Sequence, residues 1–163
     1  KTMSTAHLDT FARDHLPPPQ AQPEVLFDLP ALQFPAQLNC ATELLDRAVA
    51  EGRGERLCIQ APGIRWTYAE LQVKANRIAH VLVQDMGLVP GNRVLLRAPN
   101  SPMLAACWFA VVKAGGIAVG SMPLLRAKEL KQIAPTLSPQ RRRHRLPAAA
   151  AAALLQRRQR RRS

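Results

Sequence analysis

The stretch from Arg65 to Pro123 constrains the fold most, because its apolar pattern changes period several times and turn residues stand at each change. Thr67 and Glu70 form the Thr-x-x-Glu pattern of a capping box, which predicts that a helix begins there. Gly87 is expected to end this helix. The apolar residues between them fall at helical spacing and predict one buried face: Leu71, Ala75, Ile78, Ala79, Leu82 and Met86.

A strand, a second helix and a second strand are predicted next. The strands are short, apolar and preceded by turn residues: 93–97 after Pro90-Gly91, and 117–119 after Gly115-Gly116. Ser101-Pro102 is expected to cap and open the helix between them, since proline is tolerated at a first helical position. Residues 103–112 are apolar all round, which predicts burial on most sides. Strands alternating with helices indicate an α/β fold with a mainly parallel sheet.

Three further elements flank this stretch. Asn39 is expected to cap a helix from Cys40 to Glu51, whose inner face would consist of Ala41, Leu44, Leu45, Ala48 and Val49. Residues 57–60 and 64–66 predict a hairpin around Pro62-Gly63. A last helix is expected from Arg126 to Ile133, with Leu130 and Ile133 facing inward. We therefore assign residues 39–134 to one partial α/β domain.

The arm, residues 1–38, is rich in proline, and Pro17-Pro18-Pro19 makes a long regular element there unfavourable. A short helix is expected near Phe11. Five apolar residues are expected to anchor an extended arm on the domain: Leu26, Phe27, Leu29, Leu32 and Phe34. A free, disordered arm is the alternative. Lys1-Thr2 precede Met3 and are either a cloning remnant or the result of a mis-set start.

The tail, residues 135–163, carries most of the net charge of +12. After Ala134 there are nine arginines and no acidic residue, whereas 14 basic residues before it nearly balance 11 acidic ones. This Arg/Ala-rich composition predicts disorder and suggests a GC-rich gene read in a shifted frame. A genuine tail that binds nucleic acid by releasing counterions is the alternative. The tail has no aromatic residues for base stacking.

Two motifs at a characteristic separation carry a family resemblance. Trp66-Thr67-Tyr68-Ala69-Glu70-Leu71 and Lys113-Ala114-Gly115-Gly116 resemble motifs in the N-terminal part of the adenylate-forming superfamily. Flanking segments are similar to its aryl-CoA ligase branch, which acts on 2-aminobenzoate or benzoate: 26–30, 38–41, 91–97 and 122–130. The resemblance covers about residues 3–134.

The resemblance implies an acid–thiol ligase of aromatic compound degradation. Such enzymes form an acyl-adenylate from ATP with Mg²⁺ and then an acyl-CoA from coenzyme A. They need a Gly-rich Ser/Thr loop for the phosphates, a late lysine, and acidic residues for magnesium and ribose. None of these can be assigned to a numbered position here, so we predict no catalytic, cofactor-binding or metal-binding residue. The chain would be an inactive N-terminal fragment. A non-catalytic fragment that docks on a full-length ligase, or that self-associates through exposed core faces, is a further alternative.

Other candidate residues favour structural roles. Arg97, Asn100 and Ser101 stand at a strand end, where α/β folds bind ligands, and could meet an anion, although capping is the favoured role of Ser101. Gly115-Gly116 is interpreted as a turn rather than a phosphate loop. The remaining groups lack ligand or acid–base spacing: His7, His15, His80 and His144; Glu70 with Asp85; and Asp9 with Asp14 and His15, interpreted as a chance cluster in a flexible arm.

The cysteines and the apolar segments bear on localisation. Cys40, Cys58 and Cys107 have no metal-ligand spacing and indicate reduced thiols in a cytoplasmic protein. The sequence shows no signal-peptide pattern near its start. The apolar run 103–112 is too short to span a bilayer, so we expect no membrane anchor.

Overall fold

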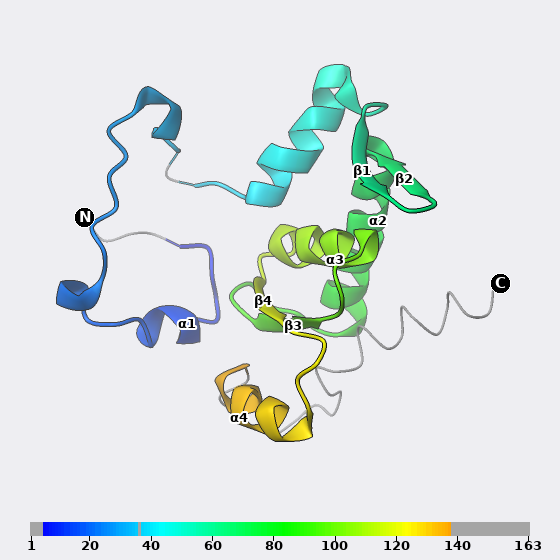
Figure 1. Cartoon of the computed structure of the whole chain (residues 1–163). Helices are drawn as coiled ribbons and strands as arrows, with labels where there is room; N and C mark the ends of the chain where they lie inside the picture. Colours follow the sequence, from blue (N-terminus) through cyan, green and yellow to red (C-terminus); the bar gives the residue numbers. More distant parts are fainter. Residues whose placement is uncertain (1–4, 36, 138–163) are drawn as a thin grey trace.

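The computed structural model describes residues 5–35 and 37–137 (Figure 1). The predictions about residues 138–163, His144 and Lys1-Thr2 lie outside these residues. The main elements follow the predicted order: α1 (Phe11–Asp14), β1 (Leu57–Ala61), β2 (Ile64–Thr67), α2 (Tyr68–His80), β3 (Arg93–Arg97), α3 (Pro102–Lys113), β4 (Ile117–Ser121) and α4 (Ala127–Leu137). The arm also contains 3-10 turns at Pro19–Ala21 and Pro30–Leu32. The helices of the body include π-helical segments at Thr42–Asp46, Val49–Arg53 and Val81–Asp85.

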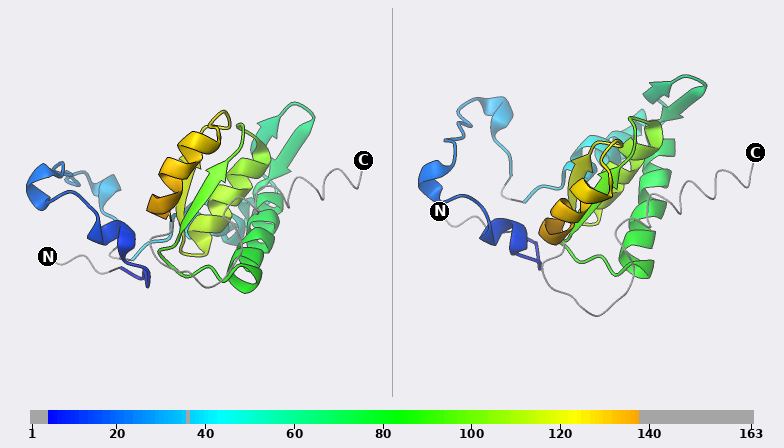
Figure 2. Two further views of the ribbon diagram at one scale, coloured as in Figure 1. Left: turned by 90° about the horizontal axis from the view of Figure 1, so that it is seen from below. Right: turned by 60° about the horizontal axis from the view of Figure 1, so that its bottom comes forward.

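The centre of the body is a parallel pair of strands. β3 pairs with β4 in register from Arg93 opposite Ile117 to Arg97 opposite Ser121, and α3 makes the crossover between them. Figure 2 shows the layers: α4 lies on one face of the pair, and α3 lies on the other with α2 behind it. β1 and β2 form a separate antiparallel hairpin. The predicted α/β fold with a parallel sheet is confirmed.

The capping box at the start of α2 is confirmed. Thr67 Oγ1 accepts a hydrogen bond from Glu70 N at 3.2 Å, and Glu70 Oε2 accepts one from Thr67 N at 2.9 Å. The helix continues through the π-helical segment Val81–Asp85, and Gly87 follows with a φ of 65°. The chain therefore leaves the helix at the glycine that the sequence indicates.

Replacing Thr67 with alanine is expected to lower the free energy of unfolding by about 1 kcal/mol, because the amide of Glu70 loses its acceptor. Urea unfolding followed by circular dichroism measures this change. Thr42→Ala is the matched control, since Thr42 is exposed on a helix and caps nothing among the described contacts. Equal unfolding free energies for the two variants would contradict a stabilising cap at Thr67.

The helix that follows the arm begins as predicted. Asn39 Oδ1 accepts from Ala41 N at 3.0 Å, and the helix ends where Gly52 adopts a φ of 78°. Ala41, Leu45 and Ala48 are buried, but Leu44 is exposed, so its predicted place on the inner face is wrong. The three buried residues form a narrow stripe along the helix, and Leu44 lies outside this stripe.

The core lies where α2, α3 and the helix 40–53 meet the sheet. Leu45, Leu71 and Val111 are its largest fully buried side chains. The other buried members of this cluster are Ala75, Leu82, Ala106 and Ala110. Ile78, Ala79 and Met86 pack against it while partly exposed, so the predicted apolar face of α2 is confirmed.

α3 is buried or half-buried at most positions, as predicted, but Trp108 is exposed. Ala106, Ala110 and Val111 are buried against α2 and the sheet, but Trp108 is 39% exposed. The physical reason is that the described chain covers α3 only where α2 and the strands contact it. An all-apolar sequence indicates that a helix can be buried on every side. It does not indicate which of these sides the described chain buries.

The last helix extends three residues beyond the boundary predicted at Ala134. α4 continues to Leu137, which is buried, and it contains Pro135. Leu130 and Ile133 are half-buried, in agreement with their predicted inward face. The division of the chain into 39–134 and 135–163 therefore stays a prediction, and the structure places its boundary inside a helix.

The arm is attached to the body by different residues from those predicted. α1 forms near Phe11 as expected. Leu26, Phe27, Leu29 and Phe34 are all exposed, so the prediction that they anchor the arm is wrong; of the five, only Leu32 is half-buried. Hydrogen bonds near Asp9 and at Asn39 attach the arm instead. Between these points the arm loops away from the helices (Figures 1 and 2).

Candidate functional site

A groove lies at the carboxyl ends of β3 and β4, the edge where parallel α/β sheets bind ligands. Its volume is about 620 Å³. It is lined by the ends of both strands, the loops that follow them and one face of α3: Leu96, Ala98, Pro99, Asn100, Leu104, Trp108, Gly120, Ser121, Met122 and Pro123. This groove is the candidate site because its lining residues come from three elements.

The groove is apolar and contains no acid–base pair. Among the described residues that line it, none is acidic, basic or a histidine. The exposed side chains of Trp108 and Met122 contribute apolar surface to it. The hydroxyl of Ser121 lies 3.5 Å from the carbonyl of Met122. Such a lining can pack against apolar groups, but it offers no cation for a phosphate.

The three residues considered for an anion lie near the groove without forming an anion site. Arg97 Nη2 donates to the carbonyl oxygens of Pro123 and Leu125, at 2.6 Å each, and so fixes the segment after β4. Ser101 Oγ accepts from Leu104 N at 3.2 Å, which confirms its role as a cap. Asn100 lines the groove. The guanidinium is thus directed at backbone carbonyls of its own chain.

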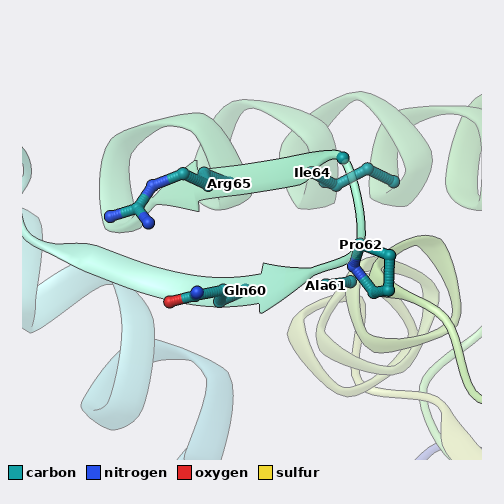
Figure 3. A pocket seen from close by; sticks show the side chains of 6 residues that line it. Gln60, Ala61, Pro62, Ile64 and Arg65 are labelled. Carbon is teal, nitrogen blue, oxygen red and sulfur yellow. The ribbon is translucent and has the colours of Figure 1, made fainter.

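A second hollow, of about 760 Å³, lies in the β1–β2 hairpin. Its lining residues all belong to one turn and the adjacent strand ends, 60–65. Figure 3 shows Pro62 and Ile64 at the turn, with Gln60 and Arg65 farther along the two strands. No residue from outside the hairpin lines this hollow, so it is the concave side of a hairpin and not a converging set of functional groups.

Lys113, from the Lys-Ala-Gly-Gly motif, joins three helices. Its Nζ lies 2.5 Å from Asp46 Oδ1 and also donates to Asn76 Oδ1. Gln72 Nε2 donates to the same Asp46 oxygen at 2.8 Å. The side chains of Lys113 and Asp46 are 21% and 24% exposed. The motif lysine is therefore engaged in helix packing at the end of α3 opposite the groove.

Asp9 does not cluster with Asp14 and His15 but contacts two residues of the body, Asn92 and Arg93, which the sequence did not predict. Its Oδ2 accepts from Asn92 Nδ2 and from Arg93 Nη1, each at 2.7 Å. Burial raises the pKa of Asp9, but hydrogen bonds from the Phe11 amide, Asn92 and Arg93 outweigh it and hold the pKa below its usual value. Sequence reasoning missed this contact because its partners are more than 80 residues apart.

Among residues 5–35 and 37–137, the thiols and imidazoles form no reactive centre. Burial raises the pKa of the Cys58 and Cys107 thiols, so both stay protonated near neutral pH. Cys40 is an exposed free thiol. His15 Nδ1 lies 2.8 Å from the Phe11 carbonyl, and Glu70 is engaged in its capping box. Within residues 5–35 and 37–137, no group of three or more His, Cys, Asp or Glu residues could hold a metal ion.

The apolar character of α3 does not make it a membrane span. No helix of the described part of the chain combines the length and hydropathy needed to cross a bilayer.

Comparison with known proteins supports the resemblance carried by the two motifs. A sequence model of the AMP-binding enzyme family matches residues 45–161, a range that includes both motifs and extends into the tail. The salicyl-AMP ligase / salicyl-S-ArCP synthetase of Mycobacterium tuberculosis is 44% identical over 68 residues, 42% of this chain and 12% of that protein. The 3-hydroxybenzoate–CoA/4-hydroxybenzoate–CoA ligase of Thauera aromatica is 33% identical over 88 residues, 54% of this chain and 17% of that protein.

A solved structure shares the fold. The anthranilate CoA ligase AuaEII, in complex with anthranoyl-AMP, superposes with a TM-score of 0.58 and 28% sequence identity. The match covers 64% of this chain and 20% of that chain. The chain thus spans between 12% and 20% of the length of these relatives.

Proposed function

We propose, given that this chain belongs to the AMP-binding enzyme family, that it is the N-terminal piece of an ATP-dependent aromatic acid–CoA ligase and is inactive by itself. The family match over residues 45–161 carries this proposal. The names of several relatives support an aromatic acid: salicyl-AMP ligase, hydroxybenzoate–CoA ligase and anthranilate CoA ligase. A cytoplasmic location, expected from the cysteines, is part of the same proposal.

The candidate groove and the motif residues do not fit the triphosphate of ATP. A site for a nucleoside triphosphate needs donors that are available to its phosphates. Arg97 donates to two carbonyls, Lys113 pairs with Asp46, and Gly115-Gly116 forms the turn before β4. No step of the reaction is therefore assigned to a residue of this chain. This misfit supports the proposal that the chain alone is inactive.

The direct test is ATP–pyrophosphate exchange with the purified chain and benzoate or 2-aminobenzoate. We expect no exchange above the rate without acid, because no cation lines the groove and Arg97 beside it donates to backbone carbonyls. A homologous full-length ligase serves as the positive control in the same assay. Exchange that depends on both the chain and an aromatic acid would overturn the proposal of inactivity.

A chimera tests whether the piece serves in a ligase. Residues 39–134 of this chain replace the matching segment of the Thauera aromatica hydroxybenzoate–CoA ligase, a relative that is 33% identical. We expect a folded chimera that forms the acyl-CoA, since the substituted segment supplies core packing and the phosphate-binding loop comes from the host ligase. The same chimera with Leu71→Ala is the control for folding. A folded chimera without activity would contradict the proposal that this segment belongs to such a ligase.

The tail needs a separate experiment because the family match extends to residue 161. Resequencing the gene across the codons for Ile133 to Arg145 and downstream tests the frameshift hypothesis. A slip that restores a frame with a Gly-rich Ser/Thr loop would support it, and a confirmed Arg-rich frame would refute it. If the tail is genuine, deleting residues 135–163 must abolish any salt-sensitive binding to nucleic acid.

The exposed groove favours one second candidate, a non-catalytic interaction piece. Trp108 and Met122 present apolar surface of the kind that associates with other proteins. Co-purification with an intact homologous ligase would favour this role. A clean monomer by light scattering, with no ligase bound, would count against it.

A further inference from the structure

Five residues of the arm, His7–Phe11, lie along the turn that precedes β3, and we call them the strap. The amides of Leu8 and Asp9 both donate to the carbonyl of Pro90, at 3.0 and 2.9 Å. Gly91 adopts a φ of 91°, and a Cβ at this position would come 2.1 Å from the carbonyl oxygen of Asp9. The strap therefore contacts the turn so closely that only a glycine fits beneath it.

The side chain of Asp9 fastens the strap with both carboxylate oxygens. Oδ2 accepts from Asn92 Nδ2 and Arg93 Nη1, at 2.7 Å each, and Oδ1 accepts from the Phe11 amide at 3.1 Å. Asn92 is itself fixed, because its Oδ1 accepts from Val89 N at 3.0 Å. Three donors thus converge on one ionised carboxylate, and bonds of this charge-assisted kind are stronger than neutral ones.

Arg93 is covered by the strap. Its side chain is only 6% exposed, and the ring of Phe11 lies 4.6 Å from its guanidinium carbon. Its Nη1 also donates to the Gly91 carbonyl at 3.2 Å, within the turn. A buried guanidinium needs a counter-charge, and the strap supplies it through Asp9. The contact therefore links the arm to the first residue of β3.

The far end of the arm is fastened near the same place. Asn39 Nδ2 donates to the Val112 carbonyl at 3.0 Å, close to the end of α3. The turn under the strap reaches this end too, since Gly91 N donates to Gly115 O at 2.8 Å. The arm between these tethers is a loop that starts and returns at one end of the body (Figure 2). Its apolar residues Leu26, Phe27 and Phe34 stay exposed.

We infer that the strap can detach from the turn before β3, and that the contacts of Asp9 keep it attached. We call this detachable contact the clasp. When Asp9 cannot accept hydrogen bonds from Asn92 and Arg93, the strap detaches from Pro90–Arg93. The whole arm then moves away from the body, while α2, α3 and the sheet stay folded. The arm then keeps only its tether at Asn39. Release of the strap depends on these contacts and is independent of the proposed ligase function.

Hydrogen–deuterium exchange of the full chain tests the clasp with Asp9→Asn. An asparagine has one acceptor oxygen, so it cannot serve Phe11 N and the Asn92–Arg93 pair at the same time. We expect the exchange of the backbone amides at positions 8 and 9 to accelerate about ten- to a hundredfold, as for the loss of hydrogen bonds to a charged group. Exchange in α2 and α3, measured in the same sample, is expected to stay unchanged.

Asp28→Asn is the matched control, because Asp28 is an exposed aspartate in the same arm. It is expected to exchange like the parent chain at the strap. Gly91→Ala approaches the clasp from the other side, since the added Cβ meets Asp9 O, and it is expected to accelerate the same two amides. Parent-like exchange of the strap in Asp9→Asn would overturn the inference. Equal acceleration throughout α2 and α3 would also overturn it, because Asp9 would then stabilise the whole fold.

Discussion

Replacing Leu71 with alanine is expected to lower the free energy of unfolding by about 2–5 kcal/mol, enough to unfold much of the chain at 25 °C. Leu71 is 0% exposed and belongs to the core cluster with Leu45 and Val111. Deleting three carbon atoms loses their transfer free energy and leaves a cavity that a small body cannot fill completely. The remaining structure has little stability to spare, because the central sheet has two strands within the described residues.

Urea unfolding followed by the fluorescence of Trp66 and Trp108 measures this loss, since Trp66 packs against the core. Val73→Ala is the control on the same helix: Val73 is 47% exposed, so its truncation should change the unfolding free energy by no more than about 0.5 kcal/mol. A loss below about 1 kcal/mol in Leu71→Ala would show that this cluster does not hold the helices together.

Signals that act over a few residues predicted much of the fold. Thr67 and Glu70 lie three residues apart, and their two hydrogen bonds form as the capping box requires. Gly87 ends a helix because a glycine adopts positive φ at little cost. The position of β3 follows from the turn before it, and its parallel pairing with β4 follows from the helix between them.

Long-range contacts escaped prediction for a physical reason. Asp9 could have paired with any cation of the chain, and nothing in its neighbourhood specifies Arg93, 84 residues away. An apolar pattern likewise indicates which face tends to be buried, but it does not indicate what covers that face. Trp108 and Phe27 show this limit, because both are apolar and both are exposed in this chain.

The candidate site shows the same difference between local contacts, which the sequence predicts, and long-range contacts, which it does not. Ser101 was predicted as a cap and is one, because a capping partner lies three residues away. Arg97 was considered for an anion, but its Nη2 binds the carbonyls of Pro123 and Leu125, 26 and 28 residues farther along the chain. Only the tertiary structure could reveal that the Arg97 guanidinium binds these backbone carbonyls instead of an anion.

Replacing Lys113 with methionine is expected to cost about 1–2 kcal/mol of unfolding free energy, because the cation that joins three helices is lost. Methionine preserves most of the apolar stem, so the loss reports on the ammonium group. Asp46 would keep its bond from Gln72 but would lose its counter-charge, and its half-buried position limits compensation by water. Urea unfolding measures the change, and Lys128→Met, at an exposed position of α4, is the control.

A double-mutant cycle with Asp46→Asn separates the pair from its surroundings. We expect a coupling energy of about 1 kcal/mol, which falls only slightly as salt is added, because the partly buried pair is poorly screened. Coupling of this size would show that the lysine of the Lys-Ala-Gly-Gly motif stabilises the packing of the helices. A coupling near zero, or equal stability of Lys113→Met and Lys128→Met, would contradict that explanation, and the lysine would then need a partner outside the described residues.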